Sequence, residues 1–101
     1  MNQQSTECKN YETYLVVAYF SSNDELRAQR NLRIEQVIKY HEPEFWVGLL
    51  AYSLKDYFKE QIPDLPKQEV WGKLLAISIS QVEWEPIAAL FLNAYRTEHS
   101  V

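Results

Sequence analysis

The stretch from His41 to Glu44, His-Glu-Pro-Glu, gathers residue types that do acid–base chemistry or bind metals. A helical zinc or iron site needs ligands three or four positions apart, because that spacing puts them on one helix face. Here the spacing is absent, and the only other histidine is His99, close to the C-terminus. The stretch therefore favours a helix start at Pro43, with two carboxylates near the positive end of the helix dipole. We expect His41 to be partly buried on the preceding helix.

No other arrangement in the sequence is typical of a catalytic or cofactor-binding site. Cys8 is the single cysteine, and it falls in a polar segment without any nucleophile motif. Only two glycines are present, too few for a glycine-rich phosphate loop, and no serine elbow occurs. We therefore predict that the protein is not an enzyme and has no catalytic residues, bound metal or cofactor.

Three arginines, Arg27, Arg30 and Arg33, form a basic stretch in the expected second helix. They suggest an alternative function, a helical nucleic-acid-binding module. Nucleic-acid binding is disfavoured by the net charge of −4, because phosphate recognition needs a concentrated basic surface. Arg30 lies inside the apolar arc of its helix. We expect either that its stem packs while its guanidinium extends to solvent, or that it pairs with a carboxylate of another helix or chain.

The content of aromatic residues is the most unusual feature of the composition, with three Trp, seven Tyr and four Phe. Tyrosine and tryptophan are enriched at protein interfaces, and a domain this small cannot bury every ring completely. Together with two of the arginines, the aromatics define a predicted partner interface. Its residues are Tyr11, Tyr14, Tyr19, Arg27, Arg30, Phe45, Leu49, Tyr52 and Tyr95.

Helices are the elements expected to position these residues. A hydrophobic fraction of 47% supplies a core, and the scarcity of glycine and proline suits helices joined by short loops. Ser22 followed by Glu25 predicts a capping box at the start of the second helix. The predicted fold is all-α, a compact four- to five-helix bundle. The expected helices cover residues 11–20, 22–40, 43–60, 67–80 and 86–98. The alternative is an α+β fold, if residues 11–20 and 74–80 pair as strands.

A weak repeat of 43 residues links two of the expected helices. Residues 42–52 and 85–95 both begin with Glu-Pro and share Leu, Ala and Tyr at matching positions. Either two helical hairpins are related by duplication, or both helices use common helix-starting residues. In both cases Phe45, Leu49 and Tyr52 form a second apolar stripe. We expect this stripe to pack on the final helix at positions Ala88, Leu92 and Tyr95, with Phe45 opposite Ala88.

The chain is expected to form one helical domain over residues 10–98, with flexible tails at 1–9 and 99–101. No secretory signal is expected from the polar start MNQQSTECKN, and no apolar run is long enough to cross a membrane. The expected location is the cytoplasm.

The combination of acidic charge, surplus aromatics and missing catalytic motifs predicts a class of function. We expect a small acidic non-catalytic protein–protein interaction module, acting as a regulator, inhibitor or adaptor. Its partner would be a protein with a basic surface. The sequence also leaves self-association as a homodimer open.

Overall fold

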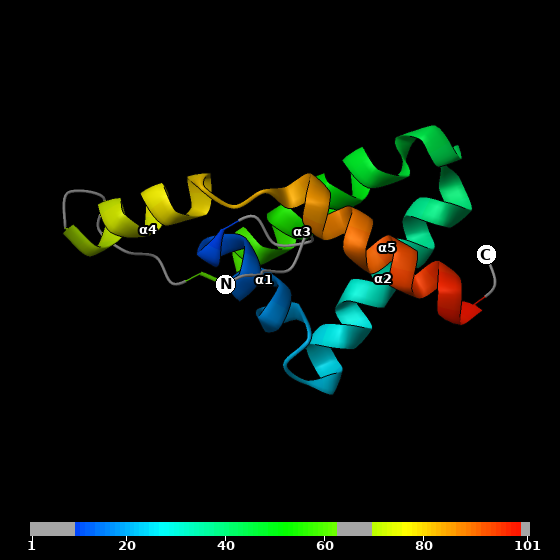
Figure 1. Cartoon of the computed structure of the whole chain (residues 1–101), viewed down its shortest axis with the longest axis horizontal. Coiled ribbons are helices and arrows are strands. Elements are labelled where there is room, and N and C mark those ends of the chain that lie inside the picture. The colour runs from blue at the N-terminus through cyan, green and yellow to red at the C-terminus, as the bar shows by residue number, and fades with distance from the viewer. Residues whose placement is uncertain (1–9, 63–69, 100–101) are drawn as a thin grey trace.

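The computed structural model describes residues 10–62 and 70–99 (Figure 1). These residues form five α-helices and one 3₁₀ turn, with no strand among them. The elements are α1 (Tyr11–Phe20), α2 (Asp24–Tyr40), η1 (Pro43–Phe45), α3 (Trp46–Glu60), α4 (Val70–Ser80) and α5 (Trp84–His99). The all-α prediction is confirmed, and the α+β alternative is wrong because 11–20 and 74–80 are both helical. The predicted tail at 1–9 lies outside the described residues, and α5 continues one residue into the predicted tail at 99–101.

The start of α1 is tied to the junction between α4 and α5. Asn10 caps the helix, since its Oδ1 accepts a 2.8 Å hydrogen bond from the Thr13 amide. The other end of the same side chain donates from Nδ2 to the carbonyl oxygen of Gln81, also at 2.8 Å. The hydroxyl of Thr13 is fully buried and accepts from the Glu83 amide at 3.0 Å. These long-range bonds hold two distant parts of the chain together.

The start of α2 differs from the prediction by one residue. Asn23 is the cap, with its Oδ1 accepting from the Leu26 amide at 2.8 Å, so the predicted capping box of Ser22 and Glu25 is wrong. Ser22 instead donates from Oγ to the Tyr19 carbonyl at 2.8 Å, at the end of α1. The physical reason is that Ser22 is already used to end one helix, which leaves the adjacent asparagine to begin the next.

The connection from α2 to α3 contains the predicted break at Pro43. A 3₁₀ turn precedes α3, and the indole Nε1 of Trp46 donates to the carbonyl oxygen of His41 at 2.8 Å. The prediction that His41 is partly buried is wrong, because it caps the end of α2 and its side chain faces solvent. The predicted helix from Pro43 therefore becomes a turn followed by α3.

The core lies where α3 and α5 cross, with α1 and α2 packed against them (Figure 1). Phe20, from α1, is fully buried and meets the Phe91 ring nearly edge-on, with ring centroids 6.2 Å apart. Leu50 and Leu54 of α3 are also completely buried. The other buried apolar side chains are Val16, Ile34, Val37, Trp46, Ala51, Trp84, Ile87, Ala88 and Leu92.

The expected packing of the second stripe of α3 is wrong. Phe45 and Tyr52 are 55% and 72% exposed, whereas Ala88 is completely buried. α3 does pack on α5, but it does so through the opposite face, which carries Leu50 and Leu54. The stripe predicted to lie inside the bundle therefore faces solvent.

Helix α4 lies to one side of the other four helices (Figure 1). Its packing on the rest of the described chain is much lighter than that between α3 and α5. The radius of gyration is 14.5 Å, above the roughly 13 Å typical of a compact domain of this length. The lateral position of α4 accounts for this elongation.

Candidate interaction surfaces

The nine residues predicted as one interface do not form one surface. Five are exposed and belong to α1 or to α3 and the 3₁₀ turn before it: Tyr11, Tyr14, Phe45, Leu49 and Tyr52. The other four are half-buried and contact other parts of the same chain: Tyr19, Arg27, Arg30 and Tyr95. The nine residues therefore belong to two separate exposed surfaces and to a set of contacts within the chain.

Arg30 packs its guanidinium against α5. Its Cζ lies 4.7 Å from the centre of the Phe91 ring, a cation–π distance, and its Nε donates to Asn31 Oδ1 at 3.3 Å. Burial lowers the pKa of Arg30, which the negative charge of Glu98 partly offsets. The expected packing of the stem is therefore accompanied by packing of the charged group itself, on an aromatic ring.

Arg33 fastens α2 to α3 in a similar way. Its Cζ lies 4.6 Å from the centre of the Tyr57 ring, and its Nη1 donates to Ser53 Oγ at 2.9 Å. The Nε is buried without a hydrogen-bond partner among the described residues. Arg27 is held locally, by a 2.7 Å bond from Nη1 to the Ser21 carbonyl and by an ion pair with Asp24. All three arginines are thus engaged in contacts within the chain.

Tyr95 connects the end of α5 to α2. Its hydroxyl donates to Glu35 Oε2 at 3.2 Å, and its ring stacks on the His99 imidazole with centroids 3.9 Å apart. Burial raises the pKa of Tyr95, and the neighbouring carboxylate of Glu35 raises it further. This tyrosine is therefore kept neutral and serves to hold two helices together.

Tyr19 belongs to the edge of the core. Its ring meets the rings of Phe20 and Phe58 edge-on, each with centroids 5.3 Å apart. Burial raises the pKa of its hydroxyl, with a further contribution from Tyr57. A role in packing explains this residue.

The first exposed surface, which we name the α1–α4 surface, is almost entirely apolar. Between the two helices lies an open hollow of about 170 Å³. Its lining residues are Glu12, Leu15, Val16, Phe58, Leu75, Ser78, Ile79 and Val82. Tyr11 and Tyr14, also on α1, are exposed and their rings stack with centroids 6.4 Å apart. An open apolar hollow is a common feature of protein-binding sites.

The outward side of α4 is a second apolar side of that helix, which we include in the α1–α4 surface, and it was missed from the sequence. Val70, Leu74 and Ile77 are 66%, 49% and 58% exposed. Their spacing puts them on one side of the helix, while Leu75 and Ile79 on the other side line the hollow. The signal was present, because a helix apolar on two sides has more apolar surface than one neighbour covers.

The second exposed surface, which we name the α3 outer face, carries the stripe of Phe45, Leu49 and Tyr52. The exposed Gly48 lies among these side chains. A shallow hollow of about 180 Å³ lies at its C-terminal end, lined by Tyr52, Lys55, Asp56 and Lys59. This face therefore combines aromatic rings with charges of both signs.

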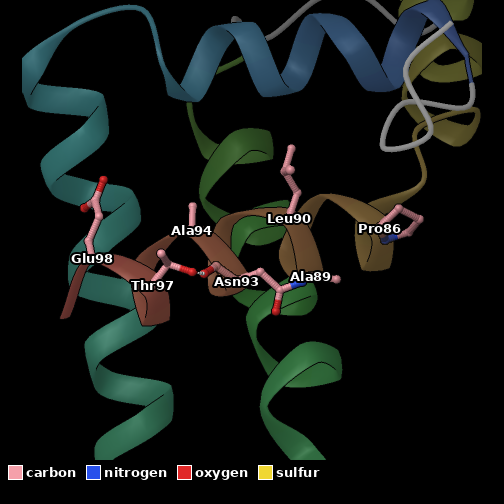
Figure 2. A pocket seen from close by; sticks show the side chains of 7 residues that line it. All are labelled: Pro86, Ala89, Leu90, Asn93, Ala94, Thr97 and Glu98. Carbon is pink, nitrogen blue, oxygen red and sulfur yellow. Dashed lines mark hydrogen bonds between the residues drawn. The ribbon is translucent and has the colours of Figure 1, made fainter. Parts of the chain in front are cut away.

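A larger hollow, of about 690 Å³, follows the outer side of α5 (Figure 2). All of its lining residues come from that one helix: Pro86, Ala89, Leu90, Asn93, Ala94, Thr97 and Glu98. The hydroxyl of Thr97 is already used, since it donates to the Asn93 carbonyl at 3.0 Å (Figure 2). Leu90 and Glu98 point to the sides of the hollow (Figure 2). A shallow trough with mostly small side chains and a single carboxylate does not assemble an acid–base pair.

The described residues contain neither a metal-binding cluster nor a single helix suited to crossing a membrane. Within 10–62 and 70–99, no group of three or more metal-binding side chains comes together, and His41 has no such cluster around it. No single helix in this part of the chain is both long and apolar enough to cross a membrane. One bent pair, Gly72–Ser80 with Trp84–His99, passes by length and composition only when the two helices are taken together across a 60° bend.

No protein-family model, no curated protein and no solved structure matches the chain.

Proposed function

We propose that this protein is a non-catalytic interaction module that binds a partner protein through the α1–α4 surface. The observation that carries the proposal is the apolar hollow between α1 and α4, together with three exposed aliphatic side chains on the outward side of α4. Soluble domains rarely leave so many neighbouring apolar groups in water unless a partner covers them. An amphipathic helix or an apolar loop of the partner would fit a hollow of this kind.

The charge of the protein favours a partner with basic residues around its apolar contact. The net charge is −4, and Glu12 lines the hollow. Opposite charges on the two proteins would speed their association and disfavour acidic competitors, while the apolar contact would supply most of the affinity. A regulator, inhibitor or adaptor would act in this way. The lone cysteine, which cannot form a disulfide within the chain, is consistent with action in the cytoplasm.

The alternative hypothesis, nucleic-acid binding through Arg27, Arg30 and Arg33, draws less support from the same geometry. Arg30 and Arg33 lie over aromatic rings, and Arg27 pairs with Asp24. Phosphate binding would require these guanidinium groups to leave their present contacts. A mobility-shift assay at about 50 mM salt tests this alternative, because electrostatic binding is strong at low salt.

The proposed function is tested by capture from the native cell with a matched pair of variants. Leu15→Glu places a charge in the hollow, and Leu32→Glu places the same charge on α2. The two leucines are equally exposed, at 46%. We expect the wild type and Leu32→Glu to retain a stoichiometric partner, and Leu15→Glu to lose it. Circular dichroism should first show equal helix content for all three proteins. Equal capture by both variants, or capture of nothing by the wild type, would contradict the proposal.

A further inference from the structure

Gly48 occupies a position where the fold itself does not require glycine. It lies within α3 and is exposed, and a Cβ atom added there would meet nothing within 4 Å. Glycine is the least favourable helix residue apart from proline, because it loses the most backbone freedom on folding. Intramolecular packing therefore gives no reason for Gly48. A close approach by another helix would give one.

The side chains next to Gly48 suit such an approach. Tyr52 follows one turn later and is 72% exposed, and Phe45 precedes it by about one turn. Residues on a helix are 100° apart, so all three lie on one side of α3. A large exposed ring beside an exposed glycine forms a projection and a recess on the same surface. Two copies of this surface would complement each other.

The charges along this edge of α3 reverse from one end to the other. Glu42 and Glu44 stand before the helix, and Lys55 and Lys59 stand in its last turns. None of the four side chains forms an ion pair with another described residue. The acidic side chains of Asp56 and Glu60 project about 100° further round the helix, toward Leu49. An antiparallel pair of these helices would place acidic ends opposite basic ends.

We propose that the α3 outer face binds the same face of a second copy of this chain, with the two α3 helices antiparallel. A two-fold axis near the middle of α3 places Tyr52 of each copy over Gly48 of the other. Glu42 and Glu44 of one copy then lie near Lys55 and Lys59 of the other. The hollow lined by Tyr52, Lys55, Asp56 and Lys59 receives the Phe45 end of the second copy.

The dimer is independent of the proposed partner site, because the α3 outer face and the α1–α4 surface share none of their exposed residues. One helix face on each side makes an interface at the small end of the known range, so we expect micromolar affinity. The experiment is sedimentation equilibrium of the full chain from about 0.1 µM to about 100 µM, which brackets such an affinity. The expected result is a rise from the monomer mass to twice that mass.

Variants of the glycine and the ring test the contact itself. Tyr52→Ala should raise the dissociation constant at least tenfold, and the α2 control Leu32→Glu should leave it unchanged. Gly48→Ala should raise the thermal midpoint of the dilute monomer and yet weaken association several-fold. A purely structural role of Gly48 would not give opposite signs in the two measurements. A protein that is monomeric throughout overturns the proposal, as does a dimer that Tyr52→Ala leaves intact.

A charge swap tests the antiparallel arrangement. Glu44→Lys and Lys59→Glu should each weaken the dimer, and the double variant should restore it. Within one chain the two positions are 15 residues apart, about 22 Å along a helix, so the restoration must come from contact between chains. Absence of restoration overturns the antiparallel arrangement. A dimer broken by Leu15→Glu but not by Tyr52→Ala would move the interface to the α1–α4 surface and equally overturn the proposal.

Discussion

Arg30 and Arg33 serve packing in this structure, although their charge first suggests a ligand. Each guanidinium lies over an aromatic ring of another helix, with its Cζ 4.7 Å from the centre of the Phe91 ring for Arg30 and 4.6 Å from that of Tyr57 for Arg33. Arginine suits this position because its planar charge is weakly hydrated and stacks on rings. The apolar arc of α2 is thus completed by two long cationic side chains whose stems and guanidinium groups both make contact. The basic stretch of the sequence therefore contributes contacts between α2 and the helices α3 and α5.

Replacing Arg33 with alanine should therefore destabilise the fold. The change removes the contact with Tyr57 and the hydrogen bond to Ser53, together about 1–2 kcal/mol of the free energy of unfolding. Urea denaturation followed by circular dichroism measures this quantity. Arg27→Ala is the matched control, since its ion pair with Asp24 is exposed and should contribute under about 0.5 kcal/mol. Equal losses for the two variants would contradict the packing role of Arg33.

Tyr95 should make stability depend on pH in the alkaline range. Folding raises its pKa, through burial and through the Glu35 carboxylate that accepts its hydrogen bond. The folded state thus holds this proton more tightly, so the stabilising contribution is complete below the ordinary tyrosine pKa of about 10. It is lost as pH rises through the higher folded value. The free energy of unfolding of the wild type should therefore fall more steeply above pH 10 than that of Tyr95→Phe. Parallel pH profiles would show that the bond to Glu35 does not form in solution.

At the scale of the helices, two asparagine caps determine where α1 and α2 begin. The sequence placed the start of α2 at Ser22 because serine followed by glutamate is a common cap pattern. Asn23 takes the role instead, since Ser22 bonds back to Tyr19 at the end of α1. The local sequence pattern identified the helix and its approximate start. It did not determine which of two neighbouring residues, Ser22 or Asn23, caps α2 and which one bonds to the end of α1.

Two alanine variants measure how much Asn23 and Ser22 each contribute to the free energy of unfolding. Asn23→Ala removes the acceptor for the Leu26 amide and should cost about 1 kcal/mol of the free energy of unfolding. Ser22→Ala removes only an exposed bond to the Tyr19 carbonyl and should cost less than about 0.5 kcal/mol. Thermal or urea denaturation of the two variants gives the order. The reverse order would restore the capping box with Glu25.

For the whole molecule, the sequence predicted the number and type of helices better than it predicted which sides they bury. Periodicity put Phe45, Leu49 and Tyr52 on a second, narrower apolar stripe of α3, behind the main face with Leu50 and Leu54, but it gave no reason to leave that stripe exposed. The choice depends on complementary shapes on α5, which local spacing does not contain. The same holds for α1, where the buried Thr13 is fixed by the Glu83 amide, 70 residues away in the chain. The aromatic side chains of α1 and α3 that the fold leaves exposed are the ones that form the candidate surfaces.

The arrangement of the molecule also predicts where it opens first. Helix α4 packs lightly on the rest of the described chain, so few buried contacts oppose its local unfolding. Its amide hydrogens should exchange orders of magnitude faster than those at the centres of α3 and α5, which surround the core. Hydrogen exchange followed by mass spectrometry measures this order directly.

The C-terminal end of α4 is attached to the start of α1 by a hydrogen bond. Asn10 donates to the Gln81 carbonyl just after α4, so Asn10→Ala releases one tether at that end. We expect faster exchange in α4 for this variant and unchanged exchange at the centre of α3. A partner bound to the α1–α4 surface should have the opposite effect and slow exchange in α4, because it covers Leu74 and Ile77. If α4 instead exchanged only together with α3 and α5, the helix would belong to the same cooperative unit as the core. Its exposed side would then be rigid before any partner binds.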